Sequence, residues 1–157
     1  MNRWLCFLIL APLLLRAESP SDVQKQIETA YAKSLAALHE AKSIEDLDEI
    51  SRSLDTRDWK SIVPGRGPWT WEDLRKHPFE SLTAPFDSAA LIIESLDLQG
   101  DTAMLSGKLR IVNHGRASLV PLKETWVRTV VGWKRKIHEK PGPPIPEPSS
   151  TPDKPGT

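Results

Sequence analysis

The side chains best suited to chemistry lie near the end of the chain, in the stretch ETWVRTVVGWKRKIHEK at residues 124–140. Charged and indole groups alternate there with other residues, and Gly132 divides the stretch into two runs. A glycine between two such runs predicts a β-hairpin. On its first strand the lysine-bearing face must be the outer one, because lysine is almost never buried. We therefore expect Glu124, Trp126 and Arg128 to point inward as pocket residues, with solvation at a frayed rim as the alternative.

The returning strand brings a second arginine to the same face. If Val131 and Gly132 form a two-residue turn, Arg128 lies opposite Arg135. Directly opposed like charges destabilise a strand pair, so the two guanidinium groups would need an anion between them. Arginine binds carboxylates in a bidentate manner, which predicts a small amphipathic acid as the ligand. Two alternatives stay open: an ion pair with an acid such as Glu94, or solvation of both arginines at the rim.

The outer face of the returning strand is predicted to carry Lys134, Lys136 and His138. A solvated outer face explains these basic groups without a nucleic acid partner. The overall charge supports this interpretation, because the chain has 21 basic and 21 acidic residues. Proteins that bind phosphate backbones usually carry a basic excess. We expect no nucleic acid partner.

Three tryptophans, Trp59, Trp69 and Trp71, flank a loop at residues 64–68. An indole offers a large apolar area and one hydrogen-bond donor, which suits a ligand contact at the mouth of a pocket. Core packing or anchoring of the loop is the alternative, since large aromatic residues dominate small cores.

The sequence contains no pattern for a metal ion, a cofactor or a nucleophile. The histidines stand singly at positions 39, 77, 114 and 138, whereas metal ligands cluster at short spacing. The loop at residues 64–68 lacks the lysine and hydroxyl residue of a phosphate-binding loop. No serine stands in a nucleophile-elbow pattern. We expect no metal and no cofactor, and the catalytic residues of any reaction stay unknown.

Residues 1–17 form a predicted signal peptide. Arg3 precedes the apolar run Trp4–Leu15, and Ala17 is small enough to precede a cleavage site. The run is far shorter than the roughly 20 residues that span a bilayer, so we expect no stable membrane insertion after cleavage. The only cysteine, Cys6, leaves with this segment. We expect a periplasmic or extracellular protein that begins near Glu18.

The rest of the chain divides into a domain and a tail. Residues 18–140 have the length of one folded domain with a single core. Residues 141–157 are rich in proline and contain one large apolar residue, so they are predicted to be disordered. A partner that recognises proline-rich segments is the alternative for this tail.

Within the domain, the hydrophobic period changes from that of a helix to that of a strand. Serine or threonine caps predict helices that begin near Pro20, Ile44 and Trp71. Glycine-containing turns separate four predicted strands, at residues 89–98, 102–112, 119–130 and 133–138. Helices followed by a run of strands imply an α+β fold with the helices on one face of a curved sheet.

The order of these elements resembles the nuclear transport factor 2-like superfamily, which includes SnoaL-like and ketosteroid-isomerase-like proteins. The resemblance rests on SIEDLDEI at residues 43–50, on TWVR at residues 125–128 and on GWK at residues 132–134. It implies three N-terminal helices packed on a strongly curved antiparallel sheet, which together form a cone-shaped half-barrel with a pocket. It also implies a homodimer formed through the sheet.

The catalytic residues of the isomerase branch have no clear counterparts in this chain. The tyrosine of that branch would match a position close to Leu35, whereas Tyr31 stands about one turn earlier. The candidates for its aspartate base are Asp58, Asp87 and Asp97, and each also suits a turn, a cap or a solvated strand face. The resemblance therefore supplies the fold and the pocket without the catalytic groups.

Together these features predict an exported, non-catalytic domain that binds a small ligand or a partner in or around a pocket. One alternative is an acid–base pocket enzyme, an isomerase or a dehydratase of the SnoaL-like or ketosteroid-isomerase-like type. The other is a dimeric adaptor with a filled interior that carries the proline-rich tail. The predicted ligand-binding residues are Trp59, Trp69, Trp71, Glu124, Trp126, Arg128 and Arg135.

Overall fold

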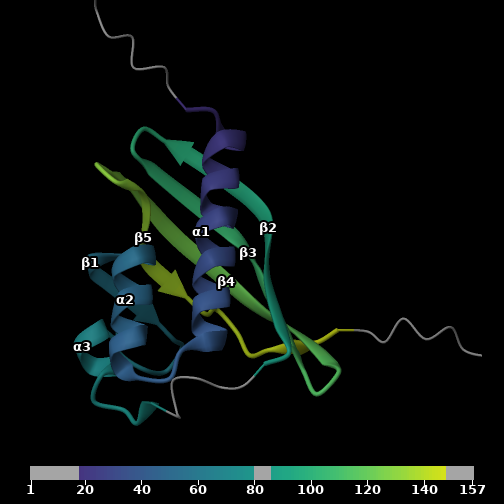
Figure 1. Ribbon diagram of the computed structural model, residues 1–157. Coiled ribbons are helices and arrows are strands. Elements are labelled where there is room, and N and C mark those ends of the chain that lie inside the picture. Colours follow the sequence, from purple (N-terminus) through teal and green to yellow (C-terminus); the bar gives the residue numbers. More distant parts are fainter. Residues whose placement is uncertain (1–17, 80–85, 148–157) are drawn as a thin grey trace, which may run out of the picture.

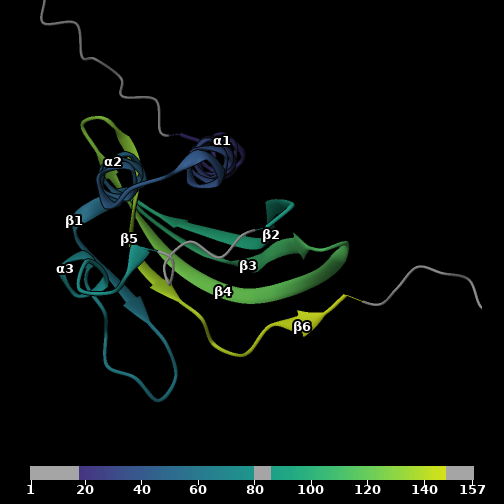
Figure 2. The ribbon, with the colours of Figure 1, turned by 60° about the horizontal axis from the view of Figure 1, so that its bottom comes forward.

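The structure is a computed structural model that describes residues 18–79 and 86–147 of the 157-residue chain. The predicted signal peptide and the end of the predicted tail, from residue 148 onward, lie outside the described residues. In chain order the elements are α1 (Pro20–Glu40), α2 (Ile44–Leu54), β1 (Asp55–Ile62), α3 (Trp71–Leu74), β2 (Ser88–Gln99), β3 (Thr102–Asn113), β4 (Arg116–Thr129), β5 (Gly132–Glu139) and β6 (Ile145–Pro146). Figure 1 labels all of them except β6, which Figure 2 labels.

The helices begin where their capping residues predict. At the start of α1, the hydroxyl of Ser19 accepts a hydrogen bond from the backbone N–H three residues later. Ser43 and Thr70 begin α2 and α3 with capping boxes, in which the cap residue and the third helical residue exchange hydrogen bonds. The apolar stripe of α1 fully buries Val23 and Ile27.

Strands β2, β3, β4 and β5 form the predicted antiparallel hairpins. In the turn between β3 and β4, His114 has a φ of 49° and Gly115 a φ of 70°. A two-residue hairpin turn whose twist matches that of the strands needs positive φ at both central positions. The predicted α+β class is confirmed.

Strand β1 corrects the predicted sheet. It begins directly after α2 and pairs with β5 in parallel, so the sheet is mixed rather than antiparallel, with the order β1-β5-β4-β3-β2. An edge strand needs only a short buried face, and β1 supplies one with Trp59 and Ser61 while Arg57 and Lys60 stay exposed. Because charged residues interrupt its apolar positions, hydrophobic periodicity does not predict this strand.

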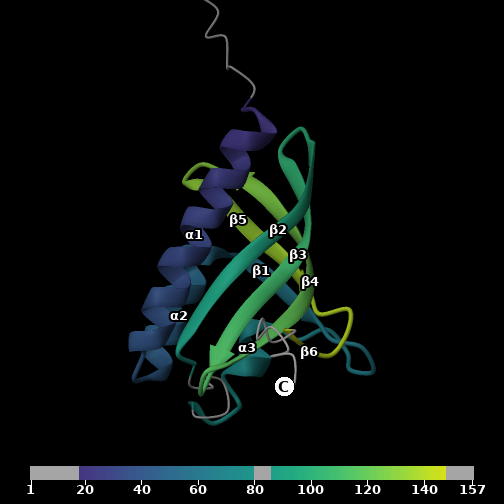
Figure 3. The ribbon, with the colours of Figure 1, turned by 90° about the vertical axis from the view of Figure 1, so that its right-hand side faces the viewer.

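The sheet is curved and unclosed, and α1 lies across its concave face with α2 beside it (Figures 2 and 3). Strands β2 and β3 approach closely at one point, since a Cβ on Gly107 would lie 2.2 Å from the carbonyl oxygen of Ile92. The pairing shifts between Ile93 and Ser95, and such a bulge bends a sheet. The core between α1 and the sheet consists of Val23, Ile27, Tyr31, Leu54, Ala103, Leu105, Leu122, Trp126 and Trp133.

The folded part extends past the predicted boundary at residue 140. Strand β4 is longer than β5, and β6 pairs with the free part of β4 at Ser118 and Leu119. The carboxylate of Glu147 accepts a hydrogen bond of 2.8 Å from Nε of Arg110. Residues 145–147 therefore belong to the sheet region and not to a disordered tail, and Pro146 suits the edge position.

Candidate functional site

The β4–β5 hairpin differs from its prediction by one residue. Val130 and Val131 form the turn, and Thr129 pairs with Gly132. The hydroxyl of Thr129 closes this turn, because it donates to the carbonyl oxygen of Gly132 at 2.7 Å and accepts from the N–H of Val131. A side chain therefore stabilises the turn that sequence reasoning had placed one position later.

This register overturns the predicted arginine pair. Arg128 lies opposite Trp133, and Trp126 lies opposite Arg135. Arg128 is exposed at the rim, where its guanidinium group lies 3.7 Å from the carboxylate of Glu18. An anion held between two opposed guanidinium groups is therefore ruled out by the strand register.

A bulge in the same hairpin corrects the prediction for His138. Thr125 pairs with Ile137 while the next residue, Trp126, pairs with Arg135, so Lys136 is an extra residue in β5. An extra residue exchanges the two faces of a strand beyond it. His138 consequently lies on the inner face, opposite Glu124 and not among the solvated lysines.

Glu124 is the centre of a buried polar network. The predicted inward orientation of Glu124 and Trp126 is confirmed, since their residues are 3% and 0% exposed. Four groups approach the carboxylate: the hydroxyl of Tyr31, the indole N–H of Trp126 at 2.8 Å, Nη1 of Arg135 at 3.2 Å and Nδ1 of His138 at 2.6 Å. Burial opposes the charge of Glu124, but Arg135 and the hydrogen bonds outweigh it and lower its pKa to about 2.

Arg135 links Glu124 to a second carboxylate, Asp55 at the start of β1. Its Nε lies 2.7 Å from Oδ1 of Asp55, and its Nη2 lies 3.2 Å from Oδ2. The indole N–H of Trp71 also donates to Asp55, at 3.0 Å. Burial raises the pKa of Asp55, although the ion pair opposes this change. Arg135 thus forms ion pairs with two buried carboxylates inside the protein, and such pairing offsets the cost of burying its charge.

The ionisation of Glu124 fixes the protons around it. A carboxylate can only accept hydrogen bonds, so Tyr31 donates its hydroxyl proton and His138 carries a proton on Nδ1. Burial raises the pKa of Tyr31, which keeps that proton in place. Burial also lowers the pKa of His138 below 6.5 despite the attraction of Glu124, so the ring is neutral near pH 7 and its Nε2 is unprotonated.

A pocket with a volume of about 630 Å³ lies beside this network. Tyr31, Asp55, Arg135 and His138 form part of its wall, together with aliphatic side chains of α1 and α2. The three tryptophans predicted as ligand contacts also line it: Trp59, Trp69 and Trp71. The rings of Trp59 and Trp71 lie 5.2 Å apart, and Trp69 stacks on His77 at 4.8 Å.

The structure therefore brings four of the predicted residues into one pocket wall: Trp59, Trp69, Trp71 and Arg135. Glu124 and Trp126 lie behind that wall, and Arg128 lies away from it. Tyr31, Asp55 and His138 also belong to the site, although they were not predicted as site residues. Tyr31 was visible on the apolar stripe of α1, but its polar partner stands 93 residues away in the sequence.

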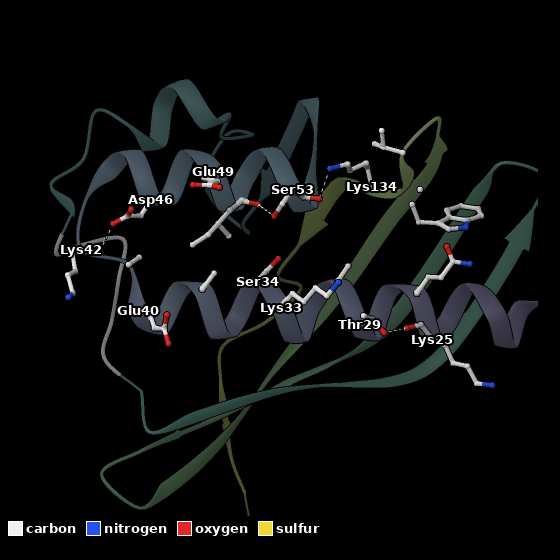
Figure 4. A pocket seen from close by; sticks show the side chains of 18 residues that line it. Lys25, Thr29, Lys33, Ser34, Glu40, Lys42, Asp46, Glu49, Ser53 and Lys134 are labelled. Atoms are coloured by element: carbon white, nitrogen blue, oxygen red, sulfur yellow. Dashed lines mark hydrogen bonds between the residues drawn. The ribbon is translucent and has the colours of Figure 1, made fainter.

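A second, larger hollow of about 1140 Å³ runs between α1 and α2 toward the β4–β5 turn. Figure 4 shows charged side chains of both signs along it: Lys25, Lys33, Glu40, Lys42, Asp46, Glu49 and Lys134. The Lys134 ammonium donates to backbone carbonyls of Arg52 and Ser53, where the end of α2 carries a partial negative charge. This groove between the two helices is lined largely by polar and charged side chains, and the buried network of the smaller pocket is not part of it.

None of the helices in residues 18–79 and 86–147 is long and apolar enough to cross a membrane. In the same ranges, no three side chains of His, Cys, Asp or Glu come together as ligands of a metal ion.

Known structures share this arrangement of helices and sheet. An NTF2-like protein with a cystatin-like fold from Novosphingobium aromaticivorans is 17% identical, with a TM-score of 0.52 over 83% of this chain and 86% of its own. An NTF2-like protein from Cytophaga hutchinsonii is 15% identical, with a TM-score of 0.56 over 83% of this chain and 100% of its own. The chain has the nuclear transport factor 2-like fold. A Parabacteroides distasonis protein with this fold, provisionally described as a ketosteroid isomerase, is 17% identical, with a TM-score of 0.55 over 81% of this chain and 89% of its own.

No family model and no curated protein matches the sequence. At these identities the structural likeness shows the fold alone, and fold does not determine function. The pocket and the Glu124 network are therefore the features of this chain that bear on its function.

Proposed function

We propose that the chain is an exported protein that binds a small amphipathic molecule in the pocket lined by Trp59, Trp69 and Trp71. The pocket itself carries this proposal, because it has about 630 Å³ of space, mostly apolar walls and a few convergent polar groups on one side. Ligand sites of small molecules usually have this composition and this range of volume.

The tryptophans favour a ligand with a flat apolar body. Trp59 is buried, while Trp69 and Trp71 are half-buried and face the same space from the loop and α3. Their rings offer large apolar surfaces, and planar molecules pack well against such surfaces. Leu35 and Leu38 complete the apolar wall from α1.

The charges around the pocket set the orientation of the ligand. Asp55 and Glu124 together carry one more charge than Arg135, so the inner wall is negative overall. Lys140 and Arg66, which also line the pocket, supply positive charge nearer to solvent. An acidic ligand would place its carboxylate toward Lys140 and Arg66 and its uncharged end against the inner wall.

Two neighbouring positions on α1 provide the test. Leu38 lines the pocket, whereas Ala37 faces the groove between the helices. Calorimetric titration with a panel of aromatic and aliphatic carboxylates, and with their uncharged amides, should show binding to the wild type. Leu38→Trp should fill the pocket and weaken that binding at least tenfold, while Ala37→Trp should leave it within about twofold. Equal binding by both variants, or no binding to the wild type across the panel, would remove the pocket as the functional site.

Export and dimerisation complete the proposal. Export is supported by the sequence of residues 1–17, and a homodimer by the exposed outer face of the sheet, which includes Ile92 and Met104. Light scattering at micromolar concentration should give twice the mass of one chain, and a monomeric mass would contradict the dimer.

A further inference from the structure

We propose that His138 accepts a proton from the bound ligand, so that the pocket has acid–base as well as binding chemistry. This inference rests on the proposed binding function, because the proton must come from a molecule in the same pocket. It assigns a role to a residue that simple alternation along β5 would leave on the outer surface.

The position of the imidazole ring carries the inference. His138 is 9% exposed, and its side chain forms part of the pocket wall. Its Nδ1 lies 2.6 Å from Oε1 of Glu124, on the side of the ring away from Nε2. The hydrogen bond to Glu124 holds the ring, and the unprotonated Nε2 is left as the basic nitrogen.

Glu124 is itself held in place as the partner of this ring. Tyr31 and Trp126 donate to its two carboxylate oxygens, and Arg135 approaches the same oxygen as Tyr31. A base that is oriented by a third group, which is in turn fixed by further hydrogen bonds, is the arrangement that general acid–base catalysis requires.

The charged groups near His138 influence whether its ring carries a proton. Glu124 on β4 attracts a protonated ring, whereas Arg135 on β5 and Lys140 beyond it repel one. Burial has the largest effect and, with this repulsion, lowers the pKa of His138, so the ring is neutral before the ligand binds. An anion formed next to the ring would reverse this balance, because it adds a second negative charge beside the imidazolium.

The proposed step is a proton transfer from an acidic O–H group, such as that of a phenol or an enol. The O–H bond breaks, a bond forms between the proton and Nε2, and the electron pair stays on the ligand oxygen. The ring then carries one positive charge and the ligand one negative charge, so the total charge is unchanged. The step needs no oxidant, reductant or other reactant.

A chromogenic phenol tests this transfer. We would titrate a nitrophenol with the wild-type protein, at a pH below the pKa of the free phenol, and record its absorbance. The spectrum of the bound phenol should shift toward that of the phenolate, with its apparent pKa lowered by about 1 unit, which is tenfold in the ionisation constant. In His138→Asn, the amide N–H can still donate to Glu124 but Nε2 is gone, so the shift should disappear.

The methyl ether of the same phenol gives a second measurement that needs no variant. The ether has nearly the same shape but no proton to donate, so it should bind the wild type roughly tenfold more weakly than the phenol. Equal binding of phenol and ether to the wild type, or the same bound spectrum in wild type and His138→Asn, would overturn the inference and leave the binding function intact. No binding of either compound at millimolar concentration would overturn both.

Discussion

Nδ1 of His138 and Oε1 of Glu124 lie 2.6 Å apart in the protein interior. The two residues belong to neighbouring strands, and simple alternation along β5 from Trp133 would place His138 on the opposite face of the sheet. The extra residue Lys136 restores the contact, because it shifts the pairing between Thr125 and Trp126. A single bulge thus brings His138 to the polar side of the pocket.

The two arginines of the hairpin should differ sharply in their effect on stability. Arg135→Met leaves Glu124 and Asp55 buried without their cation, so the free energy of unfolding should fall by about 3–5 kcal/mol. Arg128→Met removes only a rim contact with Glu18 of 3.7 Å and should change it by less than about 0.5 kcal/mol. Urea denaturation of both variants measures the difference, and similar losses would contradict the buried network.

Glu124→Gln should remove a dependence of stability on acid pH. The pKa of Glu124 is about 2 in the folded protein and 4.5 for the ordinary group. Because the folded pKa is the lower one, the carboxylate stabilises the protein above pH 4.5 and loses this effect as the pH falls toward about 2. The loss is on the order of 3 kcal/mol.

Across this pH range, the free energy of unfolding from denaturation curves should therefore fall more steeply with decreasing pH for the wild type than for Glu124→Gln. Asp55→Asn is the matched control, since burial raises the pKa of Asp55 and its titration acts in the opposite direction. A wild type and a Glu124→Gln variant that lose stability in parallel would show that Glu124 does not titrate as described.

Gly107→Ala should disrupt the bend between β2 and β3. The new methyl group would lie 2.2 Å from the backbone oxygen of Ile92, which cannot move aside as a flexible side chain would. We expect a loss of about 3 kcal/mol or more in the free energy of unfolding. At Gly67 an added Cβ meets open space, so Gly67→Ala should be neutral within about 0.5 kcal/mol. Thermal melts of both variants measure the difference, and equal losses would contradict the close approach at Gly107.

If the protein is exported as proposed, the mature protein should be shorter than the full sequence. Protein purified from the native host should begin near Glu18, because cleavage after Ala17 removes the apolar run Trp4–Leu15. N-terminal sequencing gives the answer directly. A mature protein that retains Met1 would contradict the assignment of a cleaved signal peptide.

The local signals in the sequence predicted the elements well, but pairing between distant residues was harder to foresee. The starts of the helices could be predicted from their cap residues, Ser19, Ser43 and Thr70, because capping depends on neighbours within one turn. The face of the sheet on which His138 lies depends on the bulge at Lys136 and on the turn at Val130 and Val131. Alternation along the strand predicts neither feature.

The charged groups show the same limit. Arg135 was predicted to need an anion, and two anions are present, but both come from the protein. Asp55 escaped notice since β1 is an edge strand with a charged outer face. Burial of Glu124 was foreseen from the lysines on the other face, whereas its partner Tyr31 stands in a helix 93 residues earlier. Such contacts depend on the packing of α1 on the sheet.

The nitrogen resonances of the His138 ring test the central claim most directly. In protein labelled with ¹⁵N, long-range ¹H–¹⁵N correlation at neutral pH separates a protonated ring nitrogen from a bare one, and His138→Asn assigns the signals. We predict a proton on Nδ1, a bare Nε2, and a change in the Nε2 resonance when a phenol is added. A proton on Nε2 with a bare Nδ1 would contradict the proposed hydrogen bond from His138 to Glu124. An Nε2 resonance that does not change when a phenol binds would contradict the proposed contact between this nitrogen and the ligand.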